Sequence, residues 1–81
     1  MNLERAAMKG RLSEKEDHAK RLRLRIEGNC RAIRTGLNCA LTPVDDLEVP
    51  MMAEQMDELV VAWGELQATL MDIERLNKEL A

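Results

Sequence analysis

Aromatic residues are almost absent from this sequence. It contains no Phe and no Tyr, and Trp63 is its single aromatic residue. Sandwiches and barrels of β-strands are rich in aromatic and β-branched residues, so this composition argues against both. Leu, Ala, Met, Glu, Lys and Arg dominate instead, and these are strong helix formers. The sequence therefore predicts an all-α protein.

Long hydrophobic runs are also missing. No stretch of about 18 consecutive apolar residues exists, and the N-terminal segment NLERAAMKGRL carries charges throughout. We therefore expect no transmembrane helix, no signal peptide, no membrane partner and a cytoplasmic location. A disordered chain is equally disfavoured, because 46% of the residues are hydrophobic.

Residues that carry catalytic or metal chemistry are scarce. His18 is the single histidine, and no Ser or Cys is placed to form a nucleophile–base pair with it. Cys30 and Cys39, nine residues apart without a nearby histidine, do not form a zinc pattern. The acidic connector at residues 45–48 lacks the glycine and terminal glutamate of a calcium loop. We therefore predict a protein that is not an enzyme and that uses no cofactor and no metal.

Two prolines divide the chain into two long segments. Pro43 and Pro50 flank the acidic stretch VDDLEV, and each disfavours continuation of a helix through it. We predict a single domain over residues 1–81, in which a helix spans about 3–37, a connector about 38–49 and a second helix about 50–80.

A heptad pattern runs through each segment. Apolar positions recur at alternating steps of four and three residues, which is typical of coiled-coil and bundle helices. In the second segment these positions are Met52, Met56, Leu59, Trp63, Leu66, Leu70, Ile73, Asn77 and Leu80. In the first they are Met8, Leu12, Lys15, Ala19, Leu22, Ile26, Asn29, Ile33 and Gly36.

Two long helices joined by a short connector normally fold back as an antiparallel hairpin. The register that we predict places Ile26 against Trp63, Leu22 near Leu66 and Ile33 near Met56. The residues expected in the helix-pairing or oligomer seam are Leu12, Leu22, Ile26, Ile33, Met56, Leu59, Trp63, Leu66, Leu70 and Ile73. Asn29 and Asn77 have two open interpretations: they set the register, or the stripe bends so that both amides reach water.

The two halves carry opposite charge. Residues 1–40 contain ten Lys or Arg and five acids, whereas residues 41–81 contain two and ten. The predicted register brings four pairs of charged residues together, and such pairs select the partner and orientation of a helix. The expected pairs are Lys15 with Glu74, Glu14 with Arg75, Arg25 with Glu65, and Arg31 with Glu58.

The basic stretch KRLRLRIEGNCRAIR also allows a second interpretation, contact with nucleic acid. Lys20, Arg31 and Arg34 fall on the outward face of the first helix in the predicted hairpin. Two observations argue against this function. The sequence pI is about 5.1, and the first helix has no aromatic residues on which bases could stack.

The apolar residues of the second segment exceed one narrow seam. Val60, Val61 and Ala62 adjoin Leu59 and Trp63, and exposed apolar surface of this extent usually marks an interface. We therefore expect two hairpins to assemble as a homodimeric four-helix bundle. The methionines offer either ordinary core packing or an adaptable surface for another helical protein.

Several stretches carry a family resemblance. The chain resembles small two-helix proteins encoded in Mu-like prophage regions. The stretches that carry this resemblance are NLERAAMKGRL, RLRIEGNCRAIR, DDLEV and ELQATLMDIERLNKEL. The resemblance implies a phage-derived accessory protein and carries over no functional residue, and the two prolines of the connector depart from the usual acidic turn. Together these observations predict a non-catalytic helical interaction or structural module that self-associates, with a nucleic-acid-associated protein as the alternative.

Overall fold

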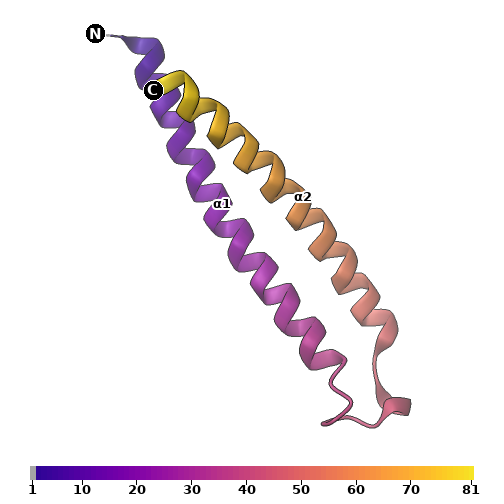
Figure 1. Ribbon diagram of the computed structural model, residues 1–81. Coiled ribbons are helices and arrows are strands. Elements are labelled where there is room, and N and C mark those ends of the chain that lie inside the picture. The colour runs from indigo at the N-terminus through magenta and orange to yellow at the C-terminus, as the bar shows by residue number, and fades with distance from the viewer. Residues whose placement is uncertain (1) are drawn as a thin grey trace.

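Two long helices, α1 (Leu3–Gly36) and α2 (Val49–Leu80), form most of the chain. The computed structural model describes residues 2–81. The helices run antiparallel, and both chain ends lie at the end of the molecule away from the connector (Figure 1). This arrangement confirms the predicted all-α hairpin, and each helix begins and ends within one residue of the expected position. A short 3-10 helix, η1 (Val44–Asp46), within the connector was not predicted.

Local hydrogen bonds define the ends of the helices. Asn2 caps α1, because its side-chain oxygen accepts a hydrogen bond of 3.1 Å from the backbone N–H of Arg5. At the other end of α1, a side chain on Gly36 would overlap the side chain of Met52, so the absence of a Cβ allows the two helices to approach closely there. In the connector, the Asn38 side chain accepts a hydrogen bond of 3.0 Å from the N–H of Ala40.

The molecule is a rod of 65 × 15 × 15 Å. Its radius of gyration is 18.4 Å, whereas a globular chain of this length has about 12 Å. A rod of two helices has one line of contact, so its core is narrow. The buried hydrophobic residues in the described part of the chain are Ala19, Leu22, Ala62, Leu66 and Leu76.

The seam of α1 follows the stripe that the sequence predicted. Ala19, Leu22 and Asn29 are buried, and Leu12, Ile26 and Ile33 are half-buried. Leu22 packs with Leu66 in the central cluster, and Ile26, Leu70 and Ile73 pack against that cluster.

The seam of α2 differs from the predicted stripe at three positions. Gln55, Ala62 and Leu76 are buried or half-buried where the sequence indicated Met56, Trp63 and Asn77. The other predicted positions are buried or half-buried as expected, and Thr69 is buried beside Leu70. These positions are Met52, Leu59, Leu66, Leu70, Ile73 and Leu80. The prediction that Met56 and Trp63 pack inside the hairpin is therefore wrong, because these side chains are 50% and 57% exposed.

Side-chain volume explains the choice between the two stripes. Two packed helices lie about 8–10 Å apart, and small residues in the seam permit that distance. Ala62 is 0% exposed and Ala19 is 1% exposed. An indole in the position of Ala62 would force the helices apart, whereas an indole at the edge of the seam keeps one face on protein and the other exposed.

The ion pairs between the helices also differ from those expected. Lys15 contacts Asp72 at 3.0 Å, two residues before the expected Glu74, and Glu74 pairs with Lys78 within α2. Within residues 2–81, the predicted pairs Glu14–Arg75, Arg25–Glu65 and Arg31–Glu58 do not form; Glu65 lies 3.9 Å from His18 instead. The register itself agrees with the prediction, because Leu22 packs with Leu66, Ile26 and Trp63 line one hollow, and Ile33 and Met56 line another. The charged partners differ because each helical residue turns the side chain by about 100°, so a neighbour in sequence can present its charge to the other helix instead.

The two asparagines of the predicted stripes have different environments. Asn77 is exposed, as the second interpretation expected. Asn29 is buried in the seam, and its amide nitrogen Nδ2 has no hydrogen-bond partner in the described residues. A buried donor without a partner costs roughly 1–3 kcal/mol of stability, so Asn29 weakens the hairpin in its present surroundings.

Replacement of Asn29 by leucine should therefore stabilise the protein. We expect Asn29→Leu to raise the free energy of unfolding by about 1–2 kcal/mol, because the change removes an unpaired buried donor and adds apolar contact. Urea unfolding followed by circular dichroism measures the difference. Asn77→Leu is the matched control and should change stability by less than about 0.5 kcal/mol. A less stable Asn29→Leu variant would contradict this expectation.

The Lys15–Asp72 pair makes stability depend on pH. The hydrogen bond from Lys15 lowers the pKa of the Asp72 carboxyl below its ordinary value of 3.8, and the positive charges of Lys15 and Arg75 act in the same direction. A carboxyl whose pKa is lowered by folding stabilises the protein above its unfolded pKa, and that stabilisation is lost as the pH falls.

We therefore expect Asp72→Asn to lower the melting temperature at pH 7, with a difference from wild type that disappears as the pH falls well below 3.8. Thermal melts over a pH series measure this. Asp57→Asn is the control, because Asp57 forms no ion pair with any described residue. An equal difference at neutral and acidic pH would exclude the ion pair as its cause.

Candidate interaction surface

An apolar groove crosses the seam between α1 and α2 in the half of the rod near the connector. It consists of two adjoining hollows of about 480 and 390 Å³. They share Cys30, Met56 and Leu59. The complete lining is Ile26, Cys30, Ile33, Arg34, Met56, Leu59, Val60 and Trp63. Arg34 is the single charged residue among these eight, so the groove suits an apolar partner.

The wall that α2 contributes arises from a second heptad stripe. Its positions again recur at steps of four and three residues: Val49, Ala53, Met56, Val60 and Trp63. Four of these positions come one residue after a seam position of α2 (52, 55, 59 and 62), which places them about 100° around the helix. The second stripe therefore lies beside the seam, and Val60 in it is 59% exposed.

The wall that α1 contributes is narrower. Ile26, Cys30 and Ile33 recur at steps of four and three residues and are half-buried. Their side chains cover the seam from one side and leave part of their apolar surface exposed in the groove. The thiol of Cys30 is free, as is that of Cys39 in the connector.

The structure divides the predicted seam residues into two groups. Ile26, Ile33, Met56, Leu59 and Trp63 line the groove. The other five, Leu12, Leu22, Leu66, Leu70 and Ile73, are buried or half-buried outside the groove. Cys30 and Val60 belong to the groove but were not among the predicted seam residues. Each lies in a run of four-and-three steps, Cys30 between Ile26 and Ile33 in α1 and Val60 between Met56 and Trp63 in α2.

The opposite flank of α2 is acidic. Glu54, Glu58, Glu65 and Asp72 each come one residue before a seam position. Two of them contact α1, since Asp72 meets Lys15 and Glu65 meets His18. The helix thus has an apolar flank on one side of the seam and a charged flank on the other.

The basic stretch of α1 remains largely without acidic partners. Its six cations are Lys20, Arg21, Arg23, Arg25, Arg31 and Arg34, and all six are exposed. None of them forms an ion pair with a described residue. Ion pairs within the hairpin therefore do not account for these charges, because α2 directs its acids to one flank while α1 carries its cations around most of its circumference. Pairing of these charges between two copies stays a prediction.

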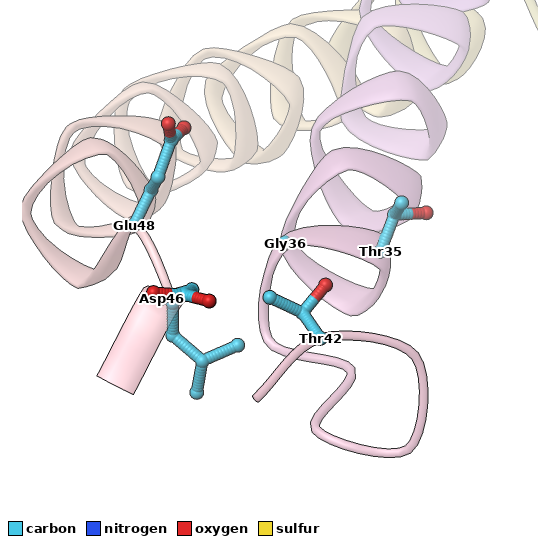
Figure 2. A pocket seen from close by; sticks show the side chains of 6 residues that line it. Thr35, Gly36, Thr42, Asp46 and Glu48 are labelled. Atoms are coloured by element: carbon cyan, nitrogen blue, oxygen red, sulfur yellow. The ribbon is translucent and has the colours of Figure 1, made fainter. Parts of the chain in front are cut away.

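The hollow at the connector is more polar. Thr35, Gly36, Thr42, Asp46, Leu47 and Glu48 line a volume of about 250 Å³ (Figure 2). The carboxylates of Asp46 and Glu48 point in different directions in this view. In the part of the chain that the structure describes, no three His, Cys, Asp or Glu side chains are grouped so that they could hold a metal ion.

Neither described helix contains a segment that is both long enough and apolar enough to cross a lipid bilayer. In comparisons with known proteins, no family model, curated protein or solved structure matched this chain.

Proposed function

We propose that this protein is a small non-catalytic helical module that associates with a second copy of itself through the apolar groove. The observation that carries the proposal is the groove itself, where Trp63, Met56 and Val60 are each at least half exposed in one continuous apolar surface. Exposed apolar surface of this kind is uncommon on monomeric proteins and usually marks an interaction site.

The small core of the hairpin supports the same function. Two of its five buried hydrophobic residues are alanines, and no large side chain among the described residues is fully buried. Domains of this size usually need a disulfide, a metal or oligomerisation to supplement the core. Both cysteines are free, and the described residues offer no metal site. Association with another chain would therefore add to the stability of a hairpin with a narrow core.

The expected affinity between two copies can be derived from the exposed apolar side chains of the groove. Full burial of a large apolar side chain contributes about 1.5–3 kcal/mol, so burial of a half-exposed one contributes roughly 1 kcal/mol. Met56, Val60 and Trp63 are at least half exposed, so in two copies these side chains contribute on the order of 6 kcal/mol, and the half-buried groove residues contribute less each. The cost of association is of similar size, about 4–15 kcal/mol. We therefore expect weak association that depends on protein concentration, with a dissociation constant in the micromolar range or above.

The proposal also covers the assembly and the cellular location of the protein. A symmetric pair of hairpins forms a four-helix bundle. We propose that the protein works in the cytoplasm as a phage-derived accessory protein, supported by the resemblance of RLRIEGNCRAIR and its neighbours to prophage-encoded proteins.

Two adjacent valines test the groove directly. Val60 lines the groove, whereas Val61 is similarly exposed, at 56%, but lines neither hollow. We expect Val60→Ser to raise the dissociation constant at least about tenfold, because each of the two copies loses roughly 1 kcal/mol of apolar burial. Val61→Ser should change it less than about twofold.

Sedimentation equilibrium or light scattering measures both variants against the wild type. A wild-type protein that stays folded and monomeric at its mass of 9.2 kDa, even at the highest attainable concentration, would contradict the proposal. Equal effects of the two valine substitutions would show that association occurs elsewhere on the rod.

A second candidate function, nucleic-acid contact, is favoured by the six exposed cations of α1. Lys20, Arg31 and Arg34, which the sequence indicated, are all exposed and lack acidic partners among the described residues. Binding to phosphates weakens steeply with salt. Fluorescence anisotropy with a labelled DNA duplex should then show binding at about 50 mM salt that is lost at about 200 mM and reduced by Arg31→Ala/Arg34→Ala. No binding at the lower salt concentration would exclude this function.

A further inference from the structure

The two helices carry opposite charge in the half of the rod that contains the groove. Residues 20–37 of the chain include six Lys or Arg and one acid, Glu27. Residues 49–66, which lie opposite them on α2, include four acids and no Lys or Arg. Any second copy that covers the groove brings its own strongly basic and strongly acidic helices against these two.

We infer that the two copies associate with their connectors at the same end, so that α1 of each copy lies beside α2 of the other. This inference rests on the self-association proposed above and specifies its geometry. The helix that each copy presents to α1 of the other is thereby its acidic one.

Symmetry leaves two ways to close one groove on another. A two-fold axis parallel to the helices brings both connectors to one end and sets each α1 between its own α2 and the α2 of the second copy. A two-fold axis across the helices sends the connectors to opposite ends and places α1 on α1 and α2 on α2. Neighbouring helices are antiparallel in both arrangements, so helix dipoles do not distinguish them.

Charge distinguishes the two arrangements. In the opposite-end arrangement α1 lies on α1, so Arg34 in the groove lining and the other cations of residues 20–37 approach the same residues of the second copy. Like charges brought together across an interface oppose association and disfavour that geometry. In the same-end arrangement, basic and acidic helices alternate around the bundle. The cations of α1 then approach residues 49–66 of the other copy, which contain no Lys or Arg.

The position of the groove favours the same arrangement. The groove lies in the connector half of the rod, between residues 26–34 of α1 and 56–63 of α2. If two copies run in opposite directions and cover each other's grooves, only their connector halves overlap. The other half of each rod then projects beyond the dimer and has no neighbour. In the same-end arrangement the rods overlap along their full length, so that Leu70 and the exposed Met71 are also covered.

Spin labels at the two ends of the rod test the arrangement. Cys30→Ala leaves Cys39 in the connector as the single label site, and Cys30→Ala/Cys39→Ala/Ala81→Cys moves that site to the far end. Double electron–electron resonance on each dimeric variant measures the distance between the labels of the two copies. Light scattering on the same samples confirms that each variant is a dimer.

We expect both distances to be below about 35 Å, because the helices of a bundle are about 8–10 Å apart and the labels add the remainder. In any opposite-end arrangement at least one of the two distances is about 45 Å or more, since α2 with 32 residues is about 48 Å long. One such long distance in a dimeric sample would overturn the same-end arrangement and leave self-association intact. Folded monomers without a dipolar signal would overturn the proposed function itself.

Discussion

The packing of small residues in the seam between α1 and α2 determines most of this structure. Ala62 is enclosed completely and Ala19 almost completely, which allows the two helices to approach closely along one line. Once Ala62 occupies the seam, Trp63 must lie about 100° around the helix, at the edge of the contact. The exposed apolar groove is therefore a direct consequence of how the hairpin closes. Fold and candidate site share a single physical cause.

Electrostatic interactions do little to hold this hairpin together. Two contacts between charged or titratable side chains join the helices, Lys15 with Asp72 and His18 with Glu65, and all four side chains are between 30% and 49% exposed to solvent. Exposed pairs contribute at most about 1 kcal/mol each. The larger feature is that α2 directs Glu54, Glu58 and Glu65 along one flank while the cations of residues 20–34 remain solvated. This unpaired charge is available to bias the approach of a second chain, whether another copy or a polyanion.

The sequence predicted much of the hairpin because its signals were local. Asn2 as the cap of α1, the prolines of the connector and the four-and-three spacing in each segment all depend on nearby residues, and they located both helices and the seam of α1. The seam of α2 was predicted only in part. Met56 and Trp63 continue the heptad pattern as well as Gln55 and Ala62 do, and spacing alone does not measure whether an indole fits between two backbones. Hydrophobicity favoured the wrong stripe, and volume decided the result.

Prediction of the groove and of the ion pairs requires knowledge of which residues of α1 face which residues of α2. Cys30 and Val60 belong to runs with the correct spacing, but nothing in either segment alone shows that the two runs face the same side of the rod. The charge pairs depended on the direction of each long side chain, and Lys15 reaches Asp72 in place of Glu74. Local patterns thus predicted the elements, whereas the site depended on side-chain volume at the contact between them.

Solvent access to Trp63 tests the central claim most directly, because this residue is the single tryptophan of the chain. Acrylamide quenching of its fluorescence should be strong at protein concentrations well below the dissociation constant, where a separate hairpin leaves the indole half exposed. Quenching should fall several-fold as the concentration rises through the micromolar range, while the far-ultraviolet circular dichroism stays constant. Strong protection from acrylamide at every concentration would place Trp63 inside the hairpin seam and contradict the account.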